Sequence, residues 1–243
     1  AVKRRGRTAV PSALVLVLGL GLGLGAAAPA HARAATTPAV QEIALLLAPH
    51  VVRQSPDGNA RAIEVVRTLR PLTDERTALP VLAHAIGTDG ATWLRVRLPG
   101  RPNSHTGWIA QRATRRATTP WHIVVERSQR RVSVYRAGHL VRRFIAIVGK
   151  PSTPTPRGEF FVEEAIALRP GDVGAPYALA LSARSTVLQE FDGGPGQIAL
   201  HGLTNVGGTL GTAVSHGCVR LADATMRWLV GRIGPGVPVT IEG

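Results

Sequence analysis

Short runs of alternating apolar and polar residues recur in the first half of the chain. Between residues 40 and 117 the segments "ALPVLAHAI", "TWLRVRL" and "GWIA" are separated by "SPDGN", "GTDG" and "PGRPNSHTG". Alternation with a period of two residues, bounded by Gly, Pro, Asn and Asp, predicts half-buried strands joined by turns. We therefore expect residues 40–117 to form a small all-β module.

A polar, basic stretch at residues 112–121 follows, and we interpret it as a linker. Residues 122–149 then alternate apolar and polar positions on both sides of "RAGH", which predicts a β-hairpin. Three prolines between residues 150 and 157 oppose regular structure, after which "EFFVEEAI" and later "QIALHG" predict further strands. Residues 121–243 are thus expected to form a second, β-dominated domain.

A single helix is predicted near the C-terminus. In "DATMRWLVGRIG" the apolar residues Met226, Leu229 and Val230 fall on one helical face, and Asp223 is expected to be the N-cap. The whole pattern predicts a mainly β protein in which a small all-β module precedes a larger β domain with one short C-terminal helix.

The N-terminal residues have a pattern of their own. Four basic residues before position 8 precede an apolar, Gly/Leu-rich run from Ala13 to Leu24, and Ala30 and Ala32 form an A-x-A site. This order is typical of a secretory signal peptide over residues 1–32, followed by a polar linker over residues 33–39. A retained signal anchor is the alternative, but the apolar run is shorter than the roughly 18 residues of a membrane span. We expect an exported protein, on the outer side of the cytoplasmic membrane or in the cell wall, with no transmembrane anchor after signal cleavage.

Charge and cysteine content narrow the classes of partner. The net charge is +14, of which four positive charges lie in residues 1–32, so the remaining chain would carry +10. Such a surface attracts polyanions, and outside the cell these are anionic wall polymers and lipid headgroups. No nucleic-acid-reading module is recognisable, so nucleic acid is not an expected partner. With one cysteine no internal disulfide can form, and stability has to come from packing.

That cysteine, Cys218, stands in "SHGCVR" at residues 215–220, directly after His216 and Gly217. By residue type alone, an unpaired cysteine is a small buried hydrophobic residue. However, glycine permits close approach of a ligand, and His201 ends an upstream strand. Histidines near a cysteine can lower the thiol pKa and accept its proton, as cysteine acyl-transfer enzymes require. The two histidines and the thiolate would also be a sound zinc ligand set, which is a second alternative.

Three motifs together carry a resemblance to a known family. "HG" at 201–202, "SHGCVR" at 215–220 and the upstream "VGKPSTPTPRGEF" make the segment from Trp121 to Gly243 resemble the L,D-transpeptidase catalytic domain, also called the YkuD-like domain. The resemblance implies a β-sandwich domain that uses no metal or cofactor. It also implies that peptidoglycan stem peptides are both acyl donor and acceptor.

The resemblance further implies a role for individual residues. Cys218 would be the nucleophile and His201 the base, with the carbonyl of Gly202 orienting the His201 ring. The thioester would pass to the side-chain amine of a second stem and give a 3→3 crosslink. Backbone amides from His216 to Cys218 would stabilise the oxyanion, and His216 would hold the loop or tune the thiolate.

The remaining motif positions are expected at the substrate. Ser215 and Gly217, which flank His216, and Gly202 are predicted substrate-binding positions together with Arg220. The family often has Asn where Arg220 stands, so Arg220 either supports the loop or binds a stem carboxylate. Pro154, Pro156 and Gly158 are expected to shape a loop near the cleft, and His122 and His139 to be ordinary strand or surface residues.

Two further alternatives stay open at the level of the sequence. Water in place of the acceptor amine would make the protein an L,D-carboxypeptidase, and a non-catalytic wall-binding protein is the rival from another class. In the first module, "TWLRVRLPGRPNSHTGWIA" resembles the closing strands of bacterial SH3-like domains, although an unrelated β-rich spacer fits the same residues. Because the motifs all follow the linker, a fragment from about Thr119 to Gly243 is expected to fold and react by itself.

Overall fold

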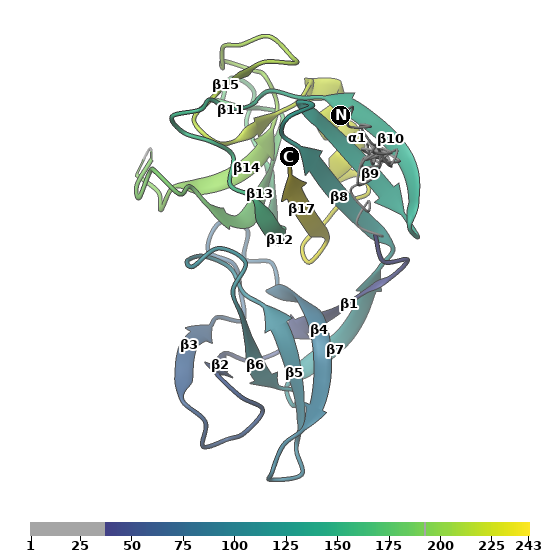
Figure 1. Cartoon of the computed structure of the whole chain (residues 1–243), viewed down its shortest axis with the longest axis vertical. Coiled ribbons are helices and arrows are strands. Elements are labelled where there is room, and N and C mark those ends of the chain that lie inside the picture. Colours follow the sequence, from purple (N-terminus) through teal and green to yellow (C-terminus); the bar gives the residue numbers. More distant parts are fainter. Residues whose placement is uncertain (1–36, 192) are drawn as a thin grey trace, which may run out of the picture. The chain divides into compact units, whose positions relative to one another are not determined.

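The structure is a computed structural model that describes residues 37–191 and 193–243 (Figure 1). The predicted signal peptide, residues 1–32, lies outside the described residues, as does most of the predicted linker at 33–39. Among the described residues, no helix is both long enough and apolar enough to cross a membrane.

Seven strands before residue 120 form one sheet, in the order β3-β2-β6-β5-β4-β1-β7. They are β1 (Gln41–Leu46), β2 (His50–Arg53), β3 (Ala62–Val66), β4 (Ala78–Ile86), β5 (Thr92–Arg97), β6 (Thr106–Ala110) and β7 (Thr114–Thr119). The alternation seen in the sequence is visible in β5, where Leu94 and Val96 are buried and Arg95 between them is exposed. The strands predicted in this region are confirmed, whereas the SH3-like identity of the module stays a prediction.

The predicted linker at residues 112–121 is wrong, because most of it is strand β7. This strand pairs antiparallel with β1 from Gln41↔Thr119 to Leu46↔Thr114. β7 lies at an edge of its sheet, where polar side chains can face water, and its threonines are β-branched residues that favour strands. Because β8 begins at Trp121, the chain passes from one sheet to the next with no linker. The domain boundary near residue 120 stays a prediction.

The second half of the chain forms an eight-stranded sheet in the order β10-β9-β8-β17-β12-β13-β14-β16, and β11 and β15 form a separate parallel pair. The elements are β8 (Trp121–Glu126), β9 (Arg131–Arg136), β10 (His139–Ile145), β11 (Val148–Gly149), β12 (Gly158–Ala167), β13 (Tyr177–Arg184), β14 (Gln197–His201), β15 (Ala213–Ser215), β16 (Val219–Arg220), α1 (Asp223–Val230) and β17 (Pro238–Glu242). The predicted hairpin is β9 and β10, and α1 is the one helix in the described part of the chain. The mainly β class with one short C-terminal helix is confirmed.

Helix α1 covers part of this core but is not capped as predicted. Met226 and Leu229 are fully buried in the apolar cluster of the second sheet. The N-cap is Ala222, and no side chain caps the helix. Asp223 is instead the first helical residue. Its carboxylate accepts hydrogen bonds from a neighbouring loop, from Leu203 N (2.7 Å) and Thr204 Oγ1 (3.1 Å).

Strand β12 contributes to both cores. Phe160 belongs to the apolar cluster of the second sheet, whereas its neighbour Phe161 belongs to the cluster of the first sheet. This follows from the strand geometry, because successive side chains point to opposite faces. Phe161 is 1% exposed and packs among residues of β1 to β6, such as Leu46 and Leu79.

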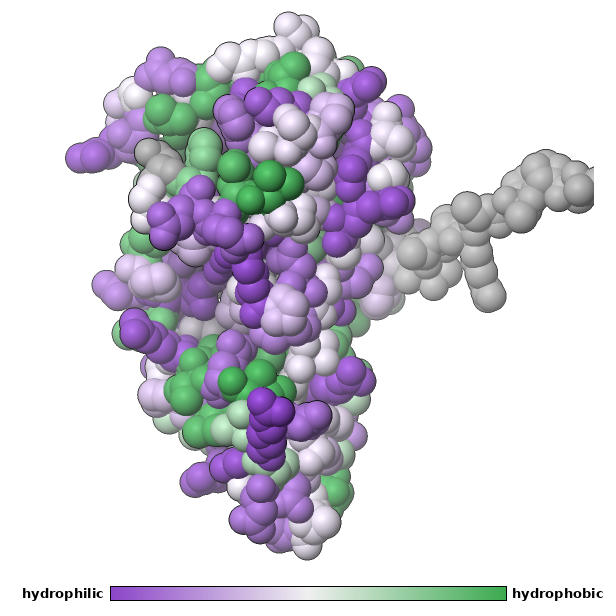
Figure 2. Space-filling view, turned by 60° about the vertical axis from the view of Figure 1, so that its left-hand side comes forward, coloured by the Kyte–Doolittle hydropathy of each residue, from purple (hydrophilic) through white to green (hydrophobic). Residues whose placement is uncertain are grey.

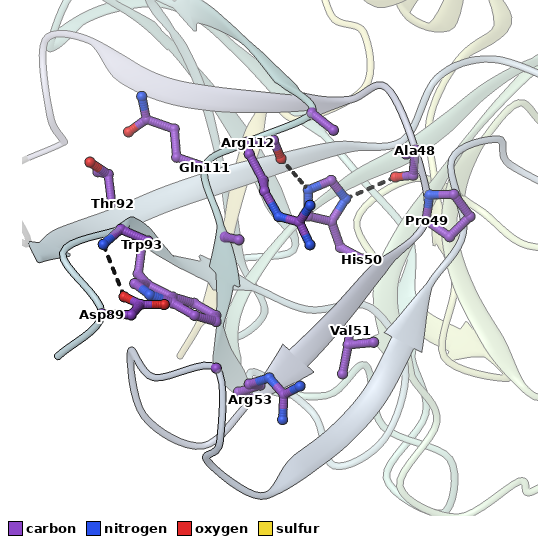
Figure 3. A pocket seen from close by; sticks show the side chains of 14 residues that line it. Ala48, Pro49, His50, Val51, Arg53, Asp89, Thr92, Trp93, Gln111 and Arg112 are labelled. Atoms are coloured by element: carbon purple, nitrogen blue, oxygen red, sulfur yellow. Dashed lines mark hydrogen bonds between the residues drawn. The ribbon is translucent and has the colours of Figure 1, made fainter. Parts of the chain in front are cut away.

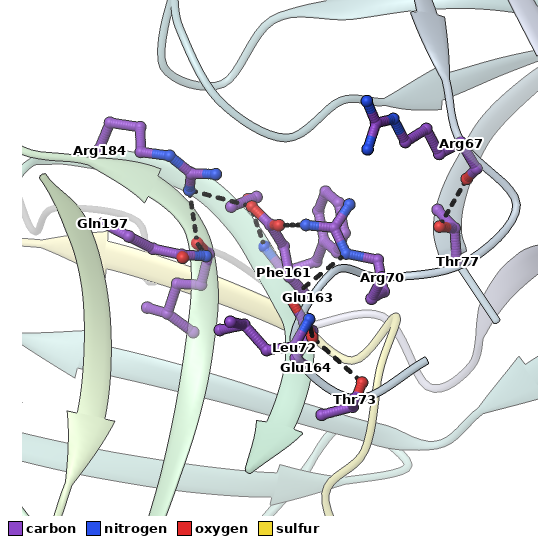
Figure 4. Close-up of polar contacts among 12 residues, drawn as sticks. Arg67, Arg70, Leu72, Thr73, Thr77, Phe161, Glu163, Glu164, Arg184 and Gln197 are labelled. Carbon is purple, nitrogen blue, oxygen red and sulfur yellow. Dashed lines mark hydrogen bonds and ion pairs between the residues drawn. The ribbon is translucent and has the colours of Figure 1, made fainter. Parts of the chain in front are cut away.

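Buried charges lie beside Phe161 (Figure 4). Glu163, whose side chain is fully buried, pairs with Arg70 from the β3–β4 connection and accepts a hydrogen bond from Arg184 Nη1 at 3.0 Å. The adjacent Glu164 accepts hydrogen bonds from Leu72 N and Thr73 Oγ1, each at 3.1 Å. The β3–β4 connection is therefore bound to β12 by ion pairs and hydrogen bonds.

Candidate active site

A cavity of about 780 Å³ lies among residues 48–113 of the first β module (Figure 3). It is lined by residues that include His50, Arg53, Asp89 and Trp93. Each ring nitrogen of His50 faces a backbone carbonyl oxygen. Nδ1 lies 2.8 Å from that of Ala48, and Nε2 lies 3.0 Å from that of Arg112. The histidine therefore supports the backbone.

A second cavity, of about 140 Å³, is lined by the candidate catalytic residues. Four of the seven predicted site residues line it, namely Cys218, His201, His216 and Arg220. The other lining residues are mostly apolar and come from separate parts of the chain: Val173, Ser185, Leu188, Phe191, Gly196, Gln197, Ile198 and Val206. The other three predicted residues, Gly202, Ser215 and Gly217, do not line the cavity.

Strand pairing brings these side chains together. β14 and β16 run parallel, with Leu200 beside Val219 and His201 beside Arg220. Paired residues point to the same face of a sheet, and so do residues two positions apart. Cys218, two residues before Arg220, therefore faces the same side as His201, which explains why residues 17 positions apart in sequence share one cavity.

The ring of His201 is held in one orientation. Its Nδ1 lies 2.8 Å from the carbonyl oxygen of Gly202, the contact expected from the sequence. A carbonyl oxygen only accepts, so Nδ1 carries the hydrogen and Nε2 is the basic nitrogen of the neutral ring. Burial lowers the pKa of His201, an effect that the Gly202 hydrogen bond opposes and the charge of Arg220 reinforces. The ring therefore favours its neutral form, the form that can accept a proton.

Cys218 is partly exposed, and it lines the cavity. Its Sγ lies 3.9 Å from the carbonyl oxygen of Gln197, and burial raises the thiol pKa above its ordinary value. A backbone hydrogen bond at Ala199 and the charge of Arg220 lower it only in part. The sequence-based expectation of a lowered thiol pKa is therefore wrong for this arrangement, because desolvation disfavours the thiolate more than its neighbours favour it.

Hydrogen bonds within the loop hold the Cys218 backbone. Ser215 is fully buried, and its Oγ donates to the carbonyl oxygen of Cys218 at 2.6 Å and accepts from Gly217 N at 3.2 Å. Thr153 and Thr155, from the proline-containing loop, donate to the carbonyl oxygens of Ser215 (3.2 Å) and Gly217 (2.8 Å). Gly217 has φ +126°, a conformation that favours glycine. Ser215 and Gly217 thus form hydrogen bonds within their own loop and to the proline-containing loop, and substrate binding by either residue stays a prediction.

His216 and Arg220 lie on opposite sides of the cysteine in sequence and have different partners. The His216 ring lies 5.5 Å from the ring of Phe191, measured between centroids, at an angle of 30°. Arg220 donates through Nη1 to the carbonyl oxygen of Gly207, and its Nε is buried without a partner among the described residues. Arg220 therefore supports a loop while it lines the cavity.

Sequence reasoning missed several residues of the site. Gly174 has φ +82°, and a Cβ there would come within 2.6 Å of His201 Nδ1, so only glycine lets this backbone approach the ring. Asp223 anchors the backbone that follows Gly202. Leu188 and Phe191 form apolar walls. No motif marks these positions, since each acts through a contact with a distant residue.

His122 and His139, expected to be ordinary strand or surface residues, lie outside the cavity. His122 is buried in β8, where its Nε2 lies 2.8 Å from Thr240 Oγ1 and burial lowers its pKa to about 4. His139 is exposed in β10. In the described part of the chain, no group of three or more His, Cys, Asp or Glu side chains is arranged to hold a metal ion.

Comparison with known proteins bears on the cysteine-containing half of the chain. A model of the family described as "L,D-transpeptidase catalytic domain" (YkuD) matches residues 120–241, half of the chain. The chain belongs to this L,D-transpeptidase family. Over 124 residues it is 32% identical to a Bacillus licheniformis protein whose name assigns it to the L,D-transpeptidases (YkuD), and the match covers 51% of this chain and 67% of the relative.

Two solved structures are also similar to this L,D-transpeptidase family member. An L,D-transpeptidase from Mycobacterium tuberculosis H37Rv is 19% identical with a TM-score of 0.43, covering 68% of this chain and 90% of that one. Bd1075 of Bdellovibrio bacteriovorus is 22% identical with a TM-score of 0.41, covering 51% of this chain and 48% of that one. The chain thus spans about half the length of the Bdellovibrio protein, and the family assignment rests on the family match and the Bacillus relative.

Proposed function

We propose that this chain is an exported cysteine L,D-transpeptidase that acts on peptidoglycan stem peptides. The observation that carries the proposal is the cavity in which Cys218 lies with His201, a histidine whose Nδ1 is occupied by the Gly202 carbonyl. This hydrogen bond orients the ring, and Nε2 is the nitrogen that can accept a proton. Family membership supplies the class of substrate, an amide between the third residue of a stem and its terminal D-Ala.

In the first half-reaction Cys218 Sγ attacks the carbonyl carbon of that amide while His201 Nε2 takes the thiol proton. The negative charge moves to the carbonyl oxygen, where the backbone N–H groups of His216 and Cys218 stabilise it. The N–H of Gly217 does not stabilise the charged oxygen in this proposal, because it donates to Ser215 Oγ. The C–N bond then breaks, His201 returns the proton to the departing D-Ala amine, and a thioester remains.

In the second half-reaction the side-chain amine of another stem attacks the thioester. A new amide forms, the C–S bond breaks and the proton returns to Cys218, which completes a 3→3 crosslink. Arg220, which lines the cavity, binds a stem carboxylate in this proposal while its Nη1 supports the loop. Attack by water would instead release a shortened stem, the carboxypeptidase outcome. Mass spectrometry after incubation with stem tetrapeptide, with and without a second stem, separates the two.

A carbapenem β-lactam tests the nucleophile directly, because its strained amide acylates a reactive thiol and adds a known mass. We expect one adduct on the wild-type protein and none on Cys218→Ala. His201→Ala should slow adduct formation by about 10² to 10⁴, the usual contribution of a general base. A small effect of His216→Ala assigns that residue to holding the loop, and an effect as large as that of His201→Ala assigns it to proton transfer.

The alternative that Cys218 is a structural residue without a catalytic role predicts a different result. The folded wild-type protein would then take no adduct and leave stem tetrapeptide uncleaved, and Cys218→Ala would mainly lower stability by leaving a small cavity. That outcome would also favour the non-catalytic wall-binding alternative.

A further inference from the structure

The turn between β5 and β6 reaches the second sheet at the end of β13. Asn103 in this turn accepts a hydrogen bond from Arg184 N at 2.8 Å and donates one to the Arg184 carbonyl oxygen at 2.7 Å. The backbone N–H of Gly100 donates to Ser182 O at 3.1 Å. The side-chain amide of Asn103 thus pairs with β13 as a neighbouring strand would, where β13 passes into its connection with β14.

Arg101, in the same turn, binds both ends of that connection. Its Nη2 donates to the carbonyl oxygens of Ser185 (2.9 Å) and Leu188 (3.0 Å), and its Nη1 donates to that of Pro195 (3.0 Å). Residues 185–196 form the connection, and residue 192 is outside the described part. One planar guanidinium therefore joins the start of the β13–β14 connection to its end, a geometry that a lysine ammonium cannot reproduce.

The connection bound by Arg101 is also a wall of the Cys218 cavity. Leu188 and Phe191 line the cavity, and the ring of Phe191 packs against that of His216. The first residue after the connection is Gln197, whose carbonyl oxygen faces the Cys218 thiol. A displacement of the connection would therefore change the shape of the cavity, while the hydrogen bond between Gly202 and His201 involves no residue of the connection.

We propose that Arg101 and Asn103 are positioning residues for acyl-donor binding: from the first β module they hold the β13–β14 connection as the wall against which the donor binds. The proposal rests on the proposed function, since the donor is the substrate of Cys218. The first module then takes part in forming the site, in addition to any role in attachment to the wall.

Adduct formation measured over a range of carbapenem concentrations tests the proposal, because it separates binding from chemistry. For Arg101→Ala we expect the half-saturating concentration to rise roughly tenfold or more, the factor that matches loss of a charge-assisted hydrogen bond, and the maximal rate to change little. Arg101→Lys should show a clear but smaller rise, because one ammonium cannot reach both ends of the connection. Arg115→Ala, which removes an exposed arginine on β7 of the same module, is the matched control and should behave as wild type.

A small thiol reagent provides the second readout. Iodoacetamide needs no donor-binding wall, so the pH profile of its reaction with Cys218 should be the same in wild type and Arg101→Ala. If Arg101→Ala does not fold, Asn103→Asp replaces it, since Asp keeps the acceptor for Arg184 N and loses the donor to Arg184 O. This variant should likewise raise the half-saturating concentration.

A purely structural role predicts a lower melting temperature with an unchanged half-saturating concentration in the folded variants, and that result would overturn the proposal. Failure of the proposed function looks different, because the wild-type protein would then take no adduct, or Cys218→Ala would still be labelled. Either of those results overturns both proposals.

Discussion

Cys218 and His201 are both shifted by burial toward their uncharged forms. Burial raises the pKa of the thiol and lowers that of the imidazole. A buried ion pair is favoured only when mutual attraction exceeds the cost of removing both charges from water. In the proposed mechanism the resting state is therefore a thiol and a neutral imidazole in one cavity, with proton transfer occurring as the thiol attacks.

This pair predicts the pH dependence of Cys218 acylation. Because the pKa of His201 lies below 6.5, the base form persists into mildly acidic solution, and the rate should fall only as pH drops through that lowered pKa. Because the pKa of Cys218 lies above 9.0, thiolate-driven acceleration should begin only in strongly alkaline solution. We expect a broad plateau between these limits, measured as the carbapenem adduct rate by mass spectrometry.

His201→Ala is the control for this profile, because loss of the base should leave a rate that climbs with thiolate concentration and shows no acid limb. A wild-type rate limited by a single thiol pKa well below neutrality would contradict the neutral pair. It would instead indicate a preformed thiolate beside an imidazolium.

At the scale of elements, β12 joins the two sheets. Phe161 fills the core of the first sheet, and Glu163 on the same strand pairs with Arg70 from the β3–β4 connection. Both contacts would be lost in a fragment that begins at about Thr119. Loss of Arg70 would remove one of the two ion-pair partners of Glu163, leaving Arg184, and loss of the first sheet would expose Phe161 to water. We therefore expect that fragment to be less stable than the full chain, and its ability to fold and react by itself stays a prediction.

Phe161→Ala tests whether β12 couples the stability of the two cores. Phenylalanine truncation in a core costs about 3 to 5 kcal/mol through lost burial and the cavity left behind, and we expect a loss of unfolding free energy in that range. Denaturant unfolding of the full chain measures it. Phe191→Ala is the matched control: Phe191 is 50% exposed, and its truncation should cost less than about 1 kcal/mol. A Phe161→Ala protein as stable as the control variant would show that the two cores are not coupled through β12.

At the scale of the whole molecule, basic charge is the dominant surface property. The chain carries 29 basic and 15 acidic residues. On the face shown in Figure 2, hydrophilic side chains predominate and hydrophobic ones gather in separate patches. Such a surface attracts polyanions over long range, and anionic wall polymers stay the predicted partners.

Binding to purified sacculi should therefore depend on salt. The screening length falls from about 10 Å at 0.1 M salt to about 3 Å at 1 M, so co-sedimentation of the protein with sacculi should decrease strongly over that range. The Cys218→Ala protein, which keeps every charge, should show the same decrease. Retention that is equal at low and molar salt would exclude charge as the means of attachment and would favour a specific binding site in residues 40–117.

The local sequence was sufficient for several strands, such as β4, β5 and β6, and for the motif residues. Alternation predicts a strand wherever one face is buried, which holds for β5 and β6. The same rule failed at residues 114–119, because an edge strand with both faces polar has no alternation to detect. It also failed at Asp223, where a carboxylate one position inside the helix found its partners in a neighbouring loop.

The sequence alone also singled out Cys218, His201, His216 and Arg220, because these residues lie in short motifs. Only the tertiary structure decided which walls surround them and in which direction the thiol and imidazole pKa values move. Burial depends on segments distant in sequence: the carbonyl oxygen of Leu188, beside the cavity, is held by Arg101, 87 positions earlier. Local pattern encodes which face of a strand is apolar, but desolvation and wall geometry arise only when distant segments pack together.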